Sequence, residues 1–164
     1  MKDPVKILVY GYGNPGRRDD GLGPALIEKI DEWIRENGIS HIDTDSNYQL
    51  NIEDAYNIRD YDLVIFADAS YENIRHLLFD RVTRSSKVAF NTHSVSPGFV
   101  LELCEKLYKK SPAVFLLHMK GHEFDLREGL SDQGKEVLDV AFGFLADLLA
   151  KPQTILAQTV IIER

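Results

Sequence analysis

The most constraining feature of this sequence is a glycine-rich segment near its start, VKILVYGYGNPGRRDDGLGPAL, at residues 5–26. An apolar, β-branched run over 5–10 predicts a strand that is buried on both faces. A loop follows over 11–19, and apolar residues then recur at helical spacing, which predicts a helix over about 20–37 that ends at Gly38. Strand, glycine loop and helix in this order usually form a ligand site at the carboxyl edge of a parallel sheet.

The rest of the chain repeats the alternation of strands and helices. Further strands are predicted, clearly at 62–67 (DLVIFA) and 113–118 (AVFLLH) and more weakly at 39–43, 76–79 and 87–90. Helical spacing begins again at Phe99, and once more after Ser131, a good N-cap, up to Pro152. This alternation predicts a single α/β domain over residues 1–164: three layers, with a mostly parallel twisted sheet and helices on both faces.

Composition narrows the class of protein. The formal net charge of −7 argues against nucleic acid as a partner, because phosphate binding needs clustered Lys and Arg. The single cysteine, Cys104, excludes an intrachain disulfide, favours a reducing compartment and is predicted to be a small core residue. Residues 1–6, MKDPVK, lack the apolar region of a signal peptide, and no apolar stretch reaches the roughly 18–20 residues that span a bilayer. A cytoplasmic protein without a membrane partner is expected.

The glycine loop fits two kinds of ligand. Gly11–Gly16, GYGNPG, matches G-x-G-x-x-G between a strand and a helix, so a nucleotide-binding α/β protein is one alternative. Asp19 and Asp20 oppose it, because two carboxylates about 4 Å from a phosphate cost on the order of several kcal/mol at an effective dielectric near 20. Pro15 also removes one N–H donor from the loop.

Two carboxylates and a histidine favour a metal site instead. Asp20 follows the first strand, Asp68 ends the strand DLVIFA, and His93 lies in the polar loop NTHSVSPG at 91–98. The carboxyl ends of parallel strands meet at one edge, so the three side chains are expected to converge. Two oxygens and one imidazole nitrogen suit a divalent ion such as Ni²⁺ or Zn²⁺. From the pattern alone, helix capping by the acids and a backbone contact of the histidine remain open.

The same residues carry a family resemblance. Residues 11–26, GYGNPGRRDDGLGPAL, resemble the G-x-G-N-x-x-x-x-D-[DE]-G-x-G signature of the hydrogenase maturation proteases. DLVIFADAS and NTHSVSPG resemble later segments of that family, in the same order. The resemblance implies an endopeptidase that removes the C-terminal extension of a nickel-loaded [NiFe] hydrogenase large-subunit precursor. A homologue that binds this partner without cleaving it is a further alternative.

The resemblance also implies roles for residues. Asp20, Asp68 and His93 would be the metal-binding and catalytic residues, with the nickel supplied by the substrate and Zn²⁺ or Cd²⁺ as substitutes in vitro. Asp19 would be a capping or supporting residue, and Asn14 would hold the turn. Four glycines would let a substrate tail approach the backbone: Gly11, Gly13, Gly21 and Gly23.

Other catalytic patterns are missing from the sequence. His118, His122 and Glu123 do not form H-E-x-x-H, and a structural or rim role is predicted for the two histidines. The resemblance implies that the loop at 121–129 borders a substrate groove. No G-x-S-x-G nucleophile elbow is present, which argues against a serine hydrolase.

Overall fold

The computed structural model describes residues 3–85, 95–157 and 162–164. The elements in chain order are β1 (Ile7–Tyr12), the 3₁₀-helix η1 (Arg18–Gly21), α1 (Leu22–Glu36), β2 (Ile42–Asn47), α2 (Asp54–Asn57), β3 (Leu63–Ser70), β4 (Leu77–Arg81), α3 (Pro97–Tyr108), β5 (Ala113–Lys120), α4 (Asp132–Leu149), α5 (Pro152–Leu156) and β6 (Ile162–Glu163).

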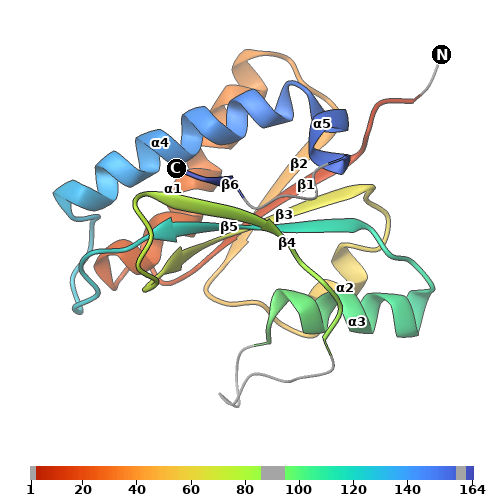
Figure 1. Cartoon of the computed structure of the whole chain (residues 1–164), viewed down its shortest axis with the longest axis horizontal. Coiled ribbons are helices and arrows are strands. Elements are labelled where there is room, and N and C mark those ends of the chain that lie inside the picture. The colour runs from red at the N-terminus through yellow and green to blue at the C-terminus, as the bar shows by residue number, and fades with distance from the viewer. Residues whose placement is uncertain (1–2, 86–94, 158–161) are drawn as a thin grey trace.

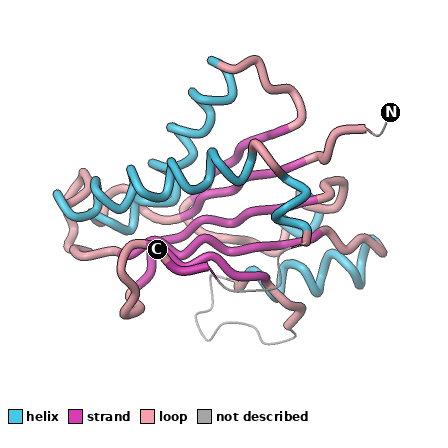
Figure 2. Tube along the Cα trace, turned by 45° about the horizontal axis from the view of Figure 1, so that its top comes forward, coloured by secondary structure: helices cyan, strands magenta, loops and turns pink. Residues whose placement is uncertain are grey.

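These strands form one sheet in the order β2-β1-β3-β5-β4-β6. The pairs from β2 to β5 are parallel, whereas β4 pairs antiparallel with both β5 and β6. Figure 2 shows the strands side by side between the helices. The predicted α/β fold with a mostly parallel sheet is confirmed.

The helices form two layers around the sheet. In Figure 1, α1, α4 and α5 lie on one side of the sheet, and α2 and α3 lie on the other. Alternate residues of β1 follow this division, since Ile7 and Val9 join the core beneath α1 and α4 while Leu8 and Tyr10 join the core beneath α2 and α3. The first strand is therefore buried on both faces, as predicted. Within the described residues, no helix combines the length and apolarity that a bilayer-spanning segment needs.

Several predicted boundaries differ from the structure. The second strand begins at Ile42 rather than at residue 39, because its ladder pairs Ile7 with Ile42 and continues to the pair Tyr12 and Asn47. β3 extends to Ser70, so Asp68 lies inside the strand and does not end it. Residues 87–90 lie outside the described residues.

The helix predicted from Phe99 begins two residues earlier, inside the expected loop. Ser96 is its N-cap, with a side chain that accepts a hydrogen bond from the backbone N–H of Phe99. Pro97 fits the first helical position because its missing N–H has no partner there in any helix. Ser131 caps α4 in the same way, and Cys104 is buried in the core, both as predicted. α4 ends at Leu149, three residues before Pro152, and Pro152 begins the short helix α5.

Close contact between β1 and α1 depends on glycine. An added Cβ on Gly23 would lie 2.7 Å from the backbone N of Tyr12 and 2.8 Å from the backbone O of Ala67. A Cβ on Gly11 would collide with the backbone of Gly23, and one on Gly13 with the backbone of Asp20. In the direction of an added Cβ, the space beside these glycines is filled by the protein's own backbone, which gives them a packing role. The expectation that they also make room for a substrate tail stays a prediction.

We expect Gly23→Ala to lower the free energy of unfolding by about 2 kcal/mol or more, because overpacking against backbone atoms has no flexible neighbour to relieve it. Gly143→Ala is the matched control. Gly143 is exposed on α4 with nothing within 4 Å of an added Cβ, so the substitution should stabilise the protein by about 0.5–1 kcal/mol. Urea unfolding of both variants measures the difference, and equal effects would contradict the close-packing argument.

Candidate functional site

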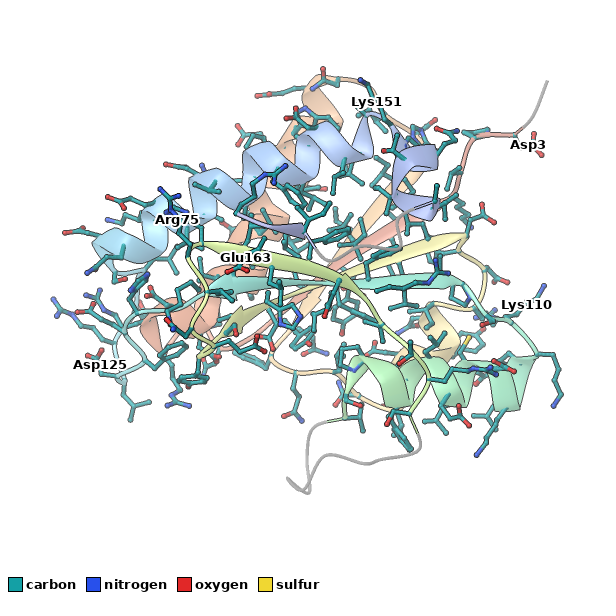
Figure 3. All side chains as sticks on the ribbon, in the orientation of Figure 1. Asp3, Arg75, Lys110, Asp125, Lys151 and Glu163 are labelled. Atoms are coloured by element: carbon teal, nitrogen blue, oxygen red, sulfur yellow. The ribbon has the colours of Figure 1, made fainter. Side chains whose placement is uncertain are left out.

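The candidate site lies at the carboxyl ends of β1 and β3. This end of the sheet can be located in Figure 3, where Arg75 follows β3 and Asp125 follows β5, while Lys110 lies at the opposite end. Asp20 and Asp68 line one cleft of about 320 Å³ there, together with residues of β1, the loop after β2 and the start of α3. The structure thus brings together two of the three predicted metal ligands.

The two adjacent aspartates have different surroundings. Asp19 is fully buried, and its carboxylate accepts hydrogen bonds from the backbone N–H groups of His122 (2.8 Å), Glu123 (3.1 Å) and Ser131 (2.8 Å). The hydroxyl of Ser131 donates a fourth bond of 2.7 Å to Asp19 and accepts one from the N–H of Gly134, in the first turn of α4. Asp19 therefore fastens the loop after β5 and the start of α4 to the glycine loop.

Asp20 instead lies partly exposed in the cleft. Its carboxylate accepts a hydrogen bond of 2.7 Å from the backbone N–H of Asn14. The side-chain oxygen of Asn14 accepts a bond of 2.9 Å from the N–H of Gly16, so Asn14 holds the turn as the family resemblance implies. These bonds fix the loop that carries Asp20 over the end of β1.

Asp68 carries the most perturbed carboxyl of the site. Burial and the nearby charge of Asp20 raise the pKa of Asp68 from 3.8 to about 7, against the opposing hydrogen bonds from the Ala69 N–H and the Tyr12 hydroxyl. The two carboxylates repel one another in a shared cleft. A bound cation would stabilise their ionised forms, because its charge offsets both the burial and the repulsion.

His93, the third predicted ligand, lies outside the described residues. Among residues 3–85, 95–157 and 162–164, no group of three or more His, Cys, Asp or Glu side chains is arranged to hold a metal ion. The described part of the cleft thus supplies two of the three predicted ligands, the carboxylates of Asp20 and Asp68.

The glycine loop has no N–H groups free for a phosphate between residues 13 and 20. Apart from Pro15, which has none, each backbone N–H there donates within the protein: for example, Gly13 to the carbonyl of Asn47, and Asp19 to that of Glu123. A pyrophosphate needs such groups at the start of the helix. The loop therefore disfavours the nucleotide-binding alternative.

His118 lies beside the site, on the strand next to Asp68. The two residues are partners in the parallel register of β3 and β5. The Nε2 of His118 lies 3.0 Å from Asp80, and its Nδ1 lies 3.6 Å from Glu72. Sequence reasoning gave His118 no role beyond structure or the rim, since only the sheet register shows that it neighbours Asp68.

Known proteins share the fold of this chain. No protein-family profile matches the chain. A Methanocaldococcus jannaschii protein named "putative hydrogenase maturation protease" is 25% identical over 153 residues, which cover 88% of this chain and 97% of that protein. The [NiFe] hydrogenase maturation protease HycI from Thermococcus kodakarensis has a TM-score of 0.73 at 20% identity, over 90% of this chain and 94% of that chain. The hydrogenase maturating endopeptidase HybD from E. coli has a TM-score of 0.64 at 19% identity, over 89% of this chain and 93% of that chain.

The fold of this chain is that of the hydrogenase maturation proteases. The resemblance that the motifs of residues 11–26, DLVIFADAS and NTHSVSPG indicate is confirmed by a distant relative in sequence and by these structures.

We expect Asp19→Asn to lower the free energy of unfolding at pH 7 by about 2–4 kcal/mol, because an amide accepts fewer bonds and turns its own N–H groups toward donors. Burial raises the pKa of Asp19, but its hydrogen bonds outweigh this and lower the pKa below 3.8. Its contribution is therefore present above pH 3.8 and is lost as pH falls through the lowered folded-state pKa. Asp20→Asn, which alters a carboxylate with one such bond, should change stability by about 1 kcal/mol or less. Urea unfolding at pH 7 and pH 3 compares the two, and equal losses would contradict the distinct role of Asp19.

We expect Asp68→Asn to stabilise the metal-free protein in a pH-dependent way. The folded-state pKa of about 7 exceeds the ordinary value of 3.8, so the native protein loses stability as pH rises between these values. Asparagine does not ionise and can still accept from Tyr12, so the variant should gain roughly 2–4 kcal/mol by pH 8 and almost nothing at pH 4. Thermal unfolding with a chelator present measures this, and a difference independent of pH would contradict the raised pKa.

Proposed function

We propose that this protein is an endopeptidase that removes the C-terminal extension of a nickel-loaded [NiFe] hydrogenase large-subunit precursor. The observation that carries the proposal is the pair Asp20 and Asp68 in one cleft, in a chain with the fold of the hydrogenase maturation proteases. The proposal includes a cytoplasmic location. The single cysteine favours a reducing compartment, and such a precursor would be processed there.

In this proposal nickel belongs to the substrate. Asp20 and Asp68 would bind the nickel of the precursor, with His93 as the third ligand. The cleft favours this event because a cation stabilises both carboxylates and removes the proton that Asp68 holds below pH 7. Precursors without nickel would leave the two acids in mutual repulsion, so the same residues would both bind the substrate and test its maturation.

The placement of the two acids would set where cleavage occurs. A divalent ion at a peptide bond can polarise the carbonyl or activate water. Asp20 is held by the backbone of Asn14, and the backbone of Asp68 belongs to the sheet. Neither acid can therefore move to bind an ion at another position. Cleavage would therefore occur at the peptide bond that the bound nickel presents.

Metal binding tests the site directly. Calorimetry with Ni²⁺, Zn²⁺ or Cd²⁺ should show one site in the wild-type protein, and Asp20→Ala or His93→Ala should abolish it or weaken it at least tenfold, because each removes a ligand. Asp139→Ala is the control, since Asp139 lies exposed on α4 and pairs with Lys29. Unchanged binding in both site variants would remove the metal assignment.

Cleavage tests the activity. A nickel-loaded large-subunit precursor should release a short C-terminal peptide when incubated with the protein, whereas the nickel-free precursor should stay intact. Mass spectrometry of the released peptide identifies the bond that is cut. If cognate precursors bind but none is cleaved, the homologue that only binds its partner is the better description.

A further inference from the structure

A tyrosine lies directly beside Asp68 in the sheet. The parallel register of β1 and β3 ends with the pair Gly11 and Ala67, and the next residues along the two strands are Tyr12 and Asp68. Ala67 faces the core beneath α1, so Asp68 points to the opposite face, where Tyr12 packs against the core beneath α2 and α3. Both residues line the cleft that contains Asp20.

The ring of Tyr12 has little freedom. Its centroid lies 6.4 Å from that of Tyr10 and 6.3 Å from that of Phe66, and both pairs meet edge to face. Phe66 is fully buried and Tyr10 almost so. A ring held by two buried aromatic neighbours presents its hydroxyl at one place, because any large rotation would break both contacts.

The hydroxyl of Tyr12 and the backbone N–H of Ala69 act on the carboxylate of Asp68 as hydrogen-bond donors, and each lowers the pKa of Asp68 against the effect of burial. The negative charge of Asp20 acts on the same carboxylate from across the cleft. Repulsion alone would turn Asp68 away from Asp20, and the hydroxyl donor opposes such a rotation.

We propose that Tyr12 is a positioning residue, whose hydroxyl holds one oxygen of Asp68 and directs the other oxygen toward Asp20 and a bound cation. This inference rests on the proposed function, since it assigns the cation to the same cleft. Hydrogen bonds to ligand carboxylates orient them, and their loss typically weakens metal binding about 10–100-fold. Position 12 is a variable position of the glycine signature, so the motif gives no sign of this role.

Tyr12→Phe tests the proposal because it keeps the ring and removes only the hydroxyl. Calorimetry with Ni²⁺ should show binding weakened about 10–100-fold. With Co²⁺ as the probe, the visible bands should shift, because a freed Asp68 would change the coordination. Tyr61→Phe is the matched control: the hydroxyl of Tyr61 donates a bond of 2.7 Å to Asp43, which does not line the cleft, so affinity and spectrum should not change.

A double-mutant cycle separates positioning from general packing. If Tyr12 acts through Asp68, Tyr12→Phe should have little further effect on metal affinity in an Asp68→Asn background, whereas two independent effects would add. Circular dichroism and thermal unfolding should show that Tyr12→Phe retains the fold.

The possible failures are distinct. A wild-type protein that binds neither Ni²⁺ nor Co²⁺ would overturn the metal site of the proposed function and this inference with it. Wild-type binding that Tyr12→Phe leaves unchanged, or additive effects in the cycle, would overturn the role of Tyr12 alone. A Tyr12→Phe protein that unfolds would assign the hydroxyl to stability and also overturn the proposal.

Discussion

One buried carboxylate joins the parts of this molecule that surround the candidate site. Asp19 accepts four hydrogen bonds from the segment between β5 and α4, which lies more than a hundred residues further along the chain. An uncompensated charge in that position would be costly, so the loop and the start of α4 can take only the arrangement that supplies all four donors. The neighbouring residue, Asp20, is then presented to the cleft on a fixed support.

Asp19 and Asp20 have different roles, one as a buried hydrogen-bond acceptor and the other as a carboxylate in the cleft. These roles explain why the glycine loop differs from a nucleotide site. A dinucleotide loop leaves its N–H groups free for an anion, whereas here the donors of residues 13–20 are used within the protein. The glycines serve the same compact packing, since α1 approaches β1 closely at Gly11 and Gly23. The loop is thus built to hold a carboxylate at the end of the sheet.

The sequence was sufficient for the fold class, because buried strands and amphipathic helices alternate with clear periodicity. The sequence was less reliable for strand bounds, where tertiary pairing overrides composition. The strand predicted at 39–43 is β2, Ile42–Asn47, and its polar second half is held by the ladder with β1. Asp68 was predicted to end its strand, whereas the ladder with β5 continues to Ser70. Asp20 and Asp68 could be proposed from their motifs, whereas Tyr12 and His118 could not, because their relation to Asp68 exists only in the sheet register.

The position of Asp68 inside β3 has a consequence for how the cleft adapts to what it binds. Its backbone pairs with His118 of β5, one residue beyond the ladder of β1 and β3, in the centre of the sheet, which is the part of a protein that opens least often. Asp20 belongs to a short 3₁₀ turn outside the sheet. One wall of the cleft is therefore as rigid as the core, and the buried Asp19 holds the turn that forms the other wall. A cleft built in this way selects ions that fit its spacing and does not adjust to ions of different radius.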